Sequence, residues 1–166
     1  MATRKWVPIV VGVVIFVVLV GAGLVGGLVY VVSRQLHVQK MTAGSGQAEF
    51  ERVAATMKGQ KPFIELPVDG EGEGRVHREM ETREPGSIST LHMRVWVSDE
   101  KKLVQLDLPY WLVRLGGNKP LKLHTTDRAF EGVDLTVTPE EIERRGPGLL
   151  LDFTTREGHR VLVWTE

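Results

Sequence analysis

Histidines are the side chains in this chain best suited to acid–base or metal chemistry, so their spacing is considered first. None of the five lies two, three or four residues from another, and those are the spacings of local metal motifs. His77 and Glu79 would share one face of a strand, but they form a single pair. His92 and His159 would approach each other if two predicted hairpins pair edge to edge. The simpler interpretation is that both are ordinary exposed polar positions.

Other residue types also lack a catalytic arrangement. The chain has no cysteine, which excludes disulfides, thiolate zinc sites, iron–sulfur clusters and cysteine nucleophiles. No serine lies in a G-x-S-x-G elbow. The pair Glu140 and Glu141 suits a helix start, and Glu71 and Glu73 suit a solvated loop. We therefore expect no catalytic residue, no metal site, no cofactor and no enzymatic activity. An enzyme or metal-binding protein that uses His92 and His159 is the less favoured alternative.

Charge is distributed unevenly along the chain. Lys and Arg total 21, Asp and Glu total 21, and the formal net charge is zero. This balance argues against a nucleic-acid-binding protein that works through a basic patch. Residues 7–32 carry no charged side chain, so nearly all of the charge lies elsewhere.

The uncharged run 7–32 is long enough to cross a membrane. A helix rises about 1.5 Å per residue, so this run exceeds a hydrocarbon core of roughly 30 Å. A cleaved signal peptide is the alternative, since 20–22 are small residues, but a signal core usually has only about 7–15 apolar residues. The sequence therefore predicts an uncleaved single-pass transmembrane helix that uses the lipid bilayer as a partner.

Residues at both ends of this run would anchor it at the membrane interface: Arg4, Lys5 and Trp6 at one end, and Tyr30 at the other. The basic pair lies close to the first end, which favours an extracytoplasmic C-terminal domain. Small residues four apart would let two such helices pair, and these are Ala22, Gly23, Gly26 and Gly27. The alternative is that a Gly/Val-rich run contains these spacings by chance.

Outside this run, the chain before position 88 divides into three parts. Residues 1–6 form a short basic tail before the helix, 33–48 a polar stalk after it, and 49–87 a short amphipathic helix with a loop-rich segment. In that helix one apolar stripe packs on its own domain or on a neighbouring chain, and its residues are Phe50, Val53, Ala54 and Met57.

Residues 88–166 show the clearest pattern of secondary structure. Apolar residues alternate over 91–97 and 104–108, and the segments 149–153 and 159–164 flank a turn that contains Gly158, which predicts two hairpins. Pro109 begins one short helix, and Thr138 begins another with a capping box completed by Glu141. The predicted fold class is α+β: a single N-terminal transmembrane helix followed by a small antiparallel β-sheet domain of two hairpins with short helices.

The same region resembles a small uncharacterised bacterial domain. The stretches LVQLDLPYWLVRLGG and GVDLTVTPEEIERRGPGLLLDFTTREGHRVLVWTE are similar to a domain of SHOCT-like proteins and of proteins connected with anti-sigma factors and envelope stress. The resemblance covers 88–166 and rests on structural motifs. It implies a regulatory context and no catalytic residue.

Three side chains are candidates for a partner-binding surface. Trp96 and Trp164 lie on predicted strands, and Arg94 lies next to Trp96, a combination found at protein interfaces. The alternative is that a helix covers this face and both rings belong to the core. We expect a membrane-anchored, non-catalytic interaction or regulatory module with a protein partner or a second copy of itself. The alternative function is a dimerising sensor of envelope state.

Overall fold

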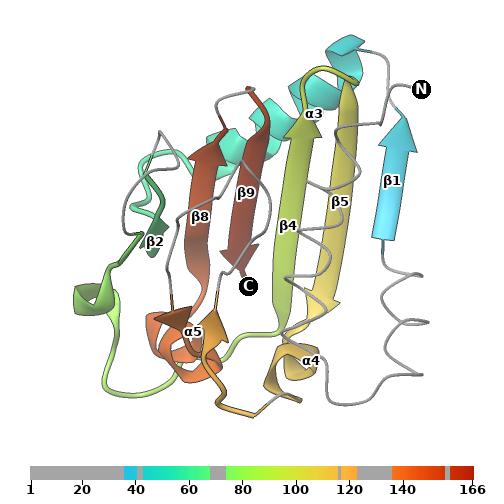
Figure 1. Ribbon diagram of the computed structural model, residues 1–166. Helices are drawn as coiled ribbons and strands as arrows, with labels where there is room; N and C mark the ends of the chain where they lie inside the picture. Colours follow the sequence, from blue (N-terminus) through green and yellow to red (C-terminus); the bar gives the residue numbers. More distant parts are fainter. Residues whose placement is uncertain (1–35, 41–42, 68–73, 116, 123–135, 156–157) are drawn as a thin grey trace.

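A seven-stranded sheet forms the centre of the protein. The computed structural model describes residues 36–40, 43–67, 74–115, 117–122, 136–155 and 158–166. Figure 1 shows α3 crossing the sheet near one end of the long strands, with α4 and α5 at the other end. The elements in chain order are β1 (Leu36–Lys40), α3 (Ala43–Thr56), β2 (Ile64–Glu65), β3 (Arg75–Val76), the 3-10 helix η1 (Arg78–Met80), β4 (Thr90–Val97), β5 (Lys102–Pro109), α4 (Tyr110–Arg114), β6 (Leu121–Lys122), β7 (Thr136–Val137), α5 (Pro139–Arg145), β8 (Gly148–Thr154) and β9 (Arg160–Thr165).

Both predicted hairpins are present, but the sheet is larger than two hairpins. β4 pairs with β5 and β8 with β9, and the antiparallel pair β4–β9 joins the two hairpins. The full order is β1-β5-β4-β9-β8-β2-β3, and β2 runs parallel to β8. The predicted small antiparallel sheet is therefore wrong, because the sheet is mixed and has outer strands on both sides. Those strands are short and are held by pairing with distant segments.

The membrane component of the predicted fold class is also contradicted. Among the described residues no helix is both long and apolar enough to span a bilayer. The longest described helix, α3, has 14 residues and includes charged side chains; at about 1.5 Å per residue it would reach only about 21 Å. The prediction of a single-pass membrane protein with an extracytoplasmic domain is corrected accordingly. The predicted helix 7–32 itself, with its pairing and anchoring residues, lies outside the described residues.

Residues 33–48, predicted as a polar stalk, contain regular structure. β1 pairs with β5 from Leu36↔Leu106 to Lys40↔Lys102, and α3 begins at Ala43. The predicted amphipathic helix thus starts within the Gly/Ser-rich stretch. Contacts of α3 with β4 and β5 stabilise this turn of helix against its low intrinsic propensity.

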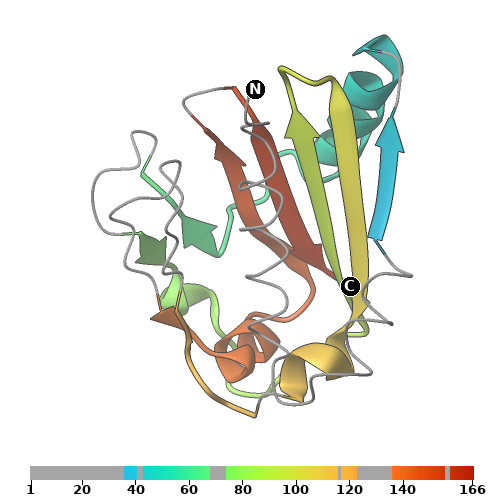
Figure 2. The ribbon, with the colours of Figure 1, turned by 45° about the vertical axis from the view of Figure 1, so that its right-hand side comes forward.

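The sheet buries a hydrophobic core on each face, because successive side chains of a strand point to opposite sides. The larger core includes Val95, Leu106 and Val163 from the central strands. α3 covers the smaller core, and Figure 2 shows α3 lying against the strands while α4 and α5 close their far end. The smaller core consists of Phe50, Trp96, Leu103, Leu149, Leu162 and Trp164, with Val53, Ala54 and Met57 packed against it.

The two short helices begin where the sequence predicts. α4 starts at Tyr110, directly after Pro109. At α5 the Thr138 hydroxyl accepts the Glu141 backbone N–H at 3.2 Å, and the Glu141 carboxylate accepts the Thr138 backbone N–H at 2.7 Å. This reciprocal pair is the predicted capping box.

A loop preceding β4 covers the last turn of α5. The Thr82 backbone N–H donates to the Arg144 carbonyl at 2.8 Å, and that of Gly86 donates to the Glu143 carbonyl at 2.7 Å. These bonds satisfy carbonyls that the end of a helix leaves unpaired. The contact is close: a Cβ on Gly86 would lie 2.9 Å from the Gly146 Cα.

Candidate functional site

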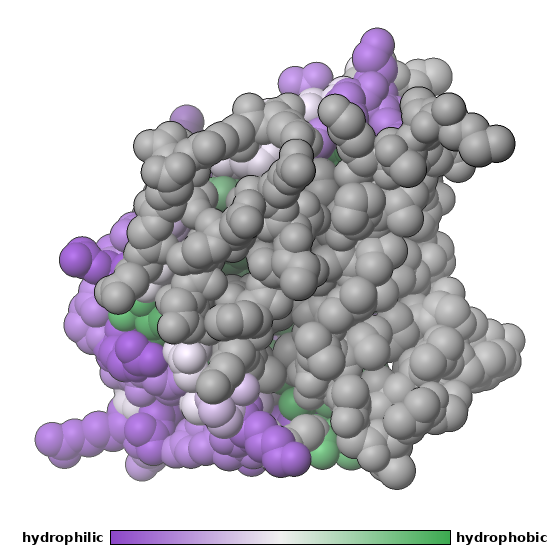
Figure 3. All heavy atoms as spheres, viewed as in Figure 1, coloured by the Kyte–Doolittle hydropathy of each residue, from purple (hydrophilic) through white to green (hydrophobic). Residues whose placement is uncertain are grey.

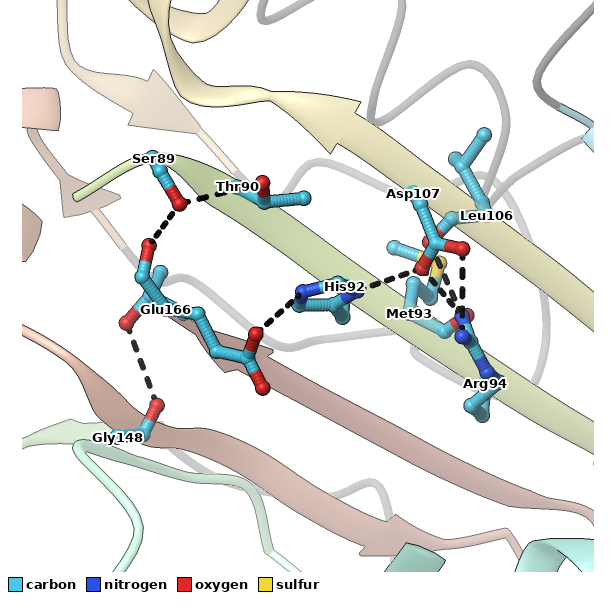
Figure 4. A network of polar contacts seen from close by, with 10 residues as sticks. Ser89, Thr90, His92, Met93, Arg94, Leu106, Asp107, Gly148 and Glu166 are labelled. Carbon is cyan, nitrogen blue, oxygen red and sulfur yellow. Dashed lines mark hydrogen bonds and ion pairs between the residues drawn. The ribbon is translucent and has the colours of Figure 1, made fainter.

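A polar cluster lies on the sheet face that also carries the smaller core. His92 and Arg94 come from β4, and Asp107 faces them from β5, since His92↔Asp107 is a register pair. The Asp107 carboxylate contacts His92 Nδ1 at 2.6 Å and accepts from Arg94 Nη1 at 2.7 Å. Figure 4 shows this carboxylate between the two side chains, and Glu166 on the other side of the imidazole.

The cluster is connected to β9 through Trp164. The His92 ring stacks on the Trp164 ring with centroids 4.8 Å apart, and the Arg94 guanidinium lies 5.2 Å from the same indole. Burial raises the pKa of Asp107, but hydrogen bonds from Arg94 and His92 outweigh it, so this pKa is below its ordinary value. Asp107 therefore stays ionised and bridges two groups of β4.

Most polar atoms of this cluster already have partners. Arg94 donates to the Met93 carbonyl as well as to both Asp107 oxygens. His92 Nε2 lies 3.5 Å from a Glu166 carboxylate oxygen and is itself buried. The arrangement fits a contact network that ties β4, β5 and β9 together.

The structure separates the two histidines proposed as a joint site. In the β4–β9 register His92 pairs with Trp164, whereas Arg160 pairs with Trp96. His159 therefore lies at the opposite end of β9 from His92. No group of three or more metal-ligating side chains suited to an ion occurs within the described part of the chain.

His159 has neighbours that the sequence did not indicate. Its Nδ1 accepts the Ser98 backbone N–H at 3.1 Å, and the Ser98 hydroxyl and the Asp99 carboxylate lie 3.2 and 3.7 Å from the same nitrogen. In a catalytic triad the serine and the carboxylate contact opposite ring nitrogens. This cluster lacks that arrangement, and it holds the turn after β4 against the start of β9.

His77 lies between two carboxylates. Its Nδ1 is 2.6 Å from Glu79 and its Nε2 is 3.0 Å from Glu65. The Glu79 carboxylate accepts a hydrogen bond from its own backbone N–H and contacts His77, and these two effects, in that order, lower the pKa of Glu79 to about 2. His77 also lowers the pKa of Glu65. His77 and Glu79 thus contact each other, but at the start of the 3-10 helix η1 and not on one face of a strand as predicted. The two ring nitrogens point in opposite directions and cannot bind one metal ion with both carboxylates.

The side chains proposed as a partner surface lie largely inside the protein. Trp96 and Trp164 are 6% and 5% exposed and belong to the smaller core under α3. The Arg94 side chain is 12% exposed. The structure thus agrees with the alternative interpretation, in which a helix covers this face. The proposed helix-pairing and membrane-anchoring residues lie outside the described part of the chain.

The described surface does contain an apolar patch, on α4. Trp111 and Leu115 are 58% and 45% exposed, and they are the large hydrophobic side chains exposed among the described residues. They are four residues apart, so they lie on one side of the helical turn. Figure 3 shows hydrophobic atoms reaching the surface at the lower edge, where Figure 1 places α4. We call Trp111 and Leu115 the α4 patch.

Sequence reasoning missed the α4 patch because all of 110–113 is apolar. The structure buries Tyr110, Leu112 and Val113 in the larger core and leaves Trp111 outside. A helix as short as α4 can bury only one side, and Trp111 occupies the other.

Comparisons with known proteins give no further guidance. No protein-family model, no curated protein and no solved structure matches this chain.

Proposed function

We propose that this protein is a non-catalytic interaction module that binds a partner protein through the α4 patch. The observation that carries the proposal is the exposure of Trp111 and Leu115 side by side. Tryptophan is among the residues that contribute most to binding energy at protein interfaces. The partner segment that fits is a peptide with apolar side chains for the patch and acidic side chains for the basic residues beside it, Arg114 and Lys119.

A buried hydrogen bond links α4 to α5, which favours binding. The Tyr110 hydroxyl donates to the Pro139 carbonyl at 2.8 Å and links α4 to α5. Burial, and then the Glu143 carboxylate, raise the pKa of Tyr110, so its hydroxyl keeps the proton that it donates. A patch already held in its binding geometry loses less conformational entropy when a partner docks.

Site-specific crosslinking tests where the partner binds. A photoreactive amino acid replaces Trp111 in the full chain and, as a control, Lys58, which is exposed near the end of α3. We expect a discrete adduct from position 111 and none of the same mass from position 58. An adduct with a second copy of the chain would instead identify a homodimer and would contradict a partner of different sequence.

Affinity then decides whether the patch causes binding. With the crosslinked protein purified, Trp111→Ala should raise its Kd at least about tenfold, which corresponds to about 1.4 kcal/mol. Urea unfolding should show nearly unchanged stability, because the indole is mostly in solvent. An unchanged Kd, or the same adduct from both positions, would refute the proposed function.

A further inference from the structure

Arg114 borders the α4 patch and has unpaired hydrogen-bond donors. It follows Trp111 by three residues, a spacing at which two side chains lie next to each other on a helix. Its Nε lies 3.0 Å from a Glu143 carboxylate oxygen. The side chain is 66% exposed, and neither Nη group has a hydrogen-bond partner among the described residues.

Glu143 fixes the direction of this guanidinium. The Glu143 side chain is only 10% exposed, and its backbone carbonyl is held by the Gly86 N–H. Because Glu143 lies at Nε, the edge of the planar group formed by the two Nη groups is left without a partner in the described part of the chain. Two parallel N–H donors in one plane match the two oxygens of a carboxylate.

The surroundings of Arg114 favour an acidic ligand. Glu143 is mostly covered, and Glu140, the other acidic side chain nearby on α5, is engaged by Asn118 at 2.7 Å and by Arg144. Lys119 is exposed a few residues beyond the patch. The edge of the patch therefore presents positive charge to a docking segment.

We propose that Arg114 binds an aspartate or glutamate carboxylate of the partner segment, and that Glu143 is the residue that positions Arg114. This inference rests on the proposed function, since the same segment places apolar side chains on Trp111 and Leu115. The occupant is thus an acidic, apolar peptide segment of another protein. Arg114 supplies charge selectivity and the α4 patch supplies most of the affinity.

Selection from a random peptide library tests the charge preference without a known partner. The full chain is immobilised, and displayed 12-residue random peptides are enriched on it. We expect peptides with apolar and acidic residues together, favoured over apolar and basic ones by about tenfold or more. Trp111→Ala should abolish the enrichment of both kinds.

Charge variants separate the inference from the proposed function. Arg114→Glu should reverse the preference towards basic peptides, and Arg114→Gln, which avoids placing two carboxylates together, should remove it. Lys58→Glu makes the same change of charge just after α3, and it should leave the preference intact. Glu143→Ala should weaken the preference, and Glu143→Gln, which keeps an oxygen for Nε, should restore it.

Each outcome of the selection has one meaning. Two outcomes overturn the role of Arg114 and leave the proposed function standing. In the first, enrichment depends on Trp111 but shows no preference for acidic peptides. In the second, Arg114→Glu does not alter the acidic preference. A selection without any Trp111-dependent enrichment overturns both.

Discussion

Phe50→Ala tests whether α3 is part of the folded domain. Phe50 is 1% exposed and lies in the smaller core between α3 and the sheet. Its ring also lies 4.7 Å from the Arg160 guanidinium on β9. The side chain thus connects a helix that the sequence places outside the domain to a central strand.

The expected loss of stability follows from these contacts. Replacing a buried phenylalanine by alanine costs about 3–5 kcal/mol, and the lost cation–π contact is included in that range at about 0.5–1 kcal/mol. Domains of this size unfold with about 5–15 kcal/mol, so the variant should fold but with a much lower urea midpoint. Phe50→Leu keeps an apolar side chain and should lose only about 1 kcal/mol.

Equilibrium urea unfolding of the full chain, followed by circular dichroism, measures this loss. Glu51→Gln is the matched control, because Glu51 is the next residue of α3 and forms a half-exposed ion pair with Arg160. That variant should stay within about 0.5 kcal/mol of the parent. If Phe50→Ala lowers the free energy of unfolding by less than about 1 kcal/mol, as little as the control does, then α3 does not stabilise the sheet.

Three further variants test other contacts. Thr138→Ala removes the N-cap of α5 and should cost about 1 kcal/mol in urea unfolding, whereas Thr138→Ser should cost much less. Gly86→Ala places a Cβ against the Gly146 backbone, which cannot move aside easily, and should cost about 1–3 kcal/mol; an unchanged midpoint would contradict the close contact. Glu79 has its pKa lowered from 4.5 to about 2, so it stabilises the fold above its unfolded pKa and loses this effect as the pH falls towards 2. Glu79→Gln should therefore reduce the loss of stability between about pH 4.5 and pH 2, and parallel pH profiles for variant and parent would contradict the contact with His77.

Local sequence patterns predicted the central part of the fold. The β4–β5 hairpin follows from alternating apolar residues, and the β8–β9 hairpin follows from two segments that flank a turn with Gly158. The helix α5 follows from its capping box. These features depend on residues close together in the chain, so a sequence is enough to indicate them. The strands β1, β2 and β3 have two to five residues each and are stabilised by partners far along the chain. Their place in the sheet therefore depends on those distant partners and not on local periodicity alone.

The candidate site was harder to predict than the fold. Trp96 and Trp164 have the composition of a binding surface, and only the position of α3 shows that they are covered. Trp111 looks like a core residue within an apolar stretch, and only the side that α4 turns to the sheet shows that it is exposed.

The sequence by itself determined the α+β character, the two hairpins, the helix starts and the absence of cysteine chemistry. The tertiary structure alone decided the mixed order of the sheet, the ends of β9 at which His92 and His159 lie, and which tryptophan faces solvent. The physical reason is that periodicity assigns a side chain to one face of an element, whereas burial of that face depends on which distant segment packs against it.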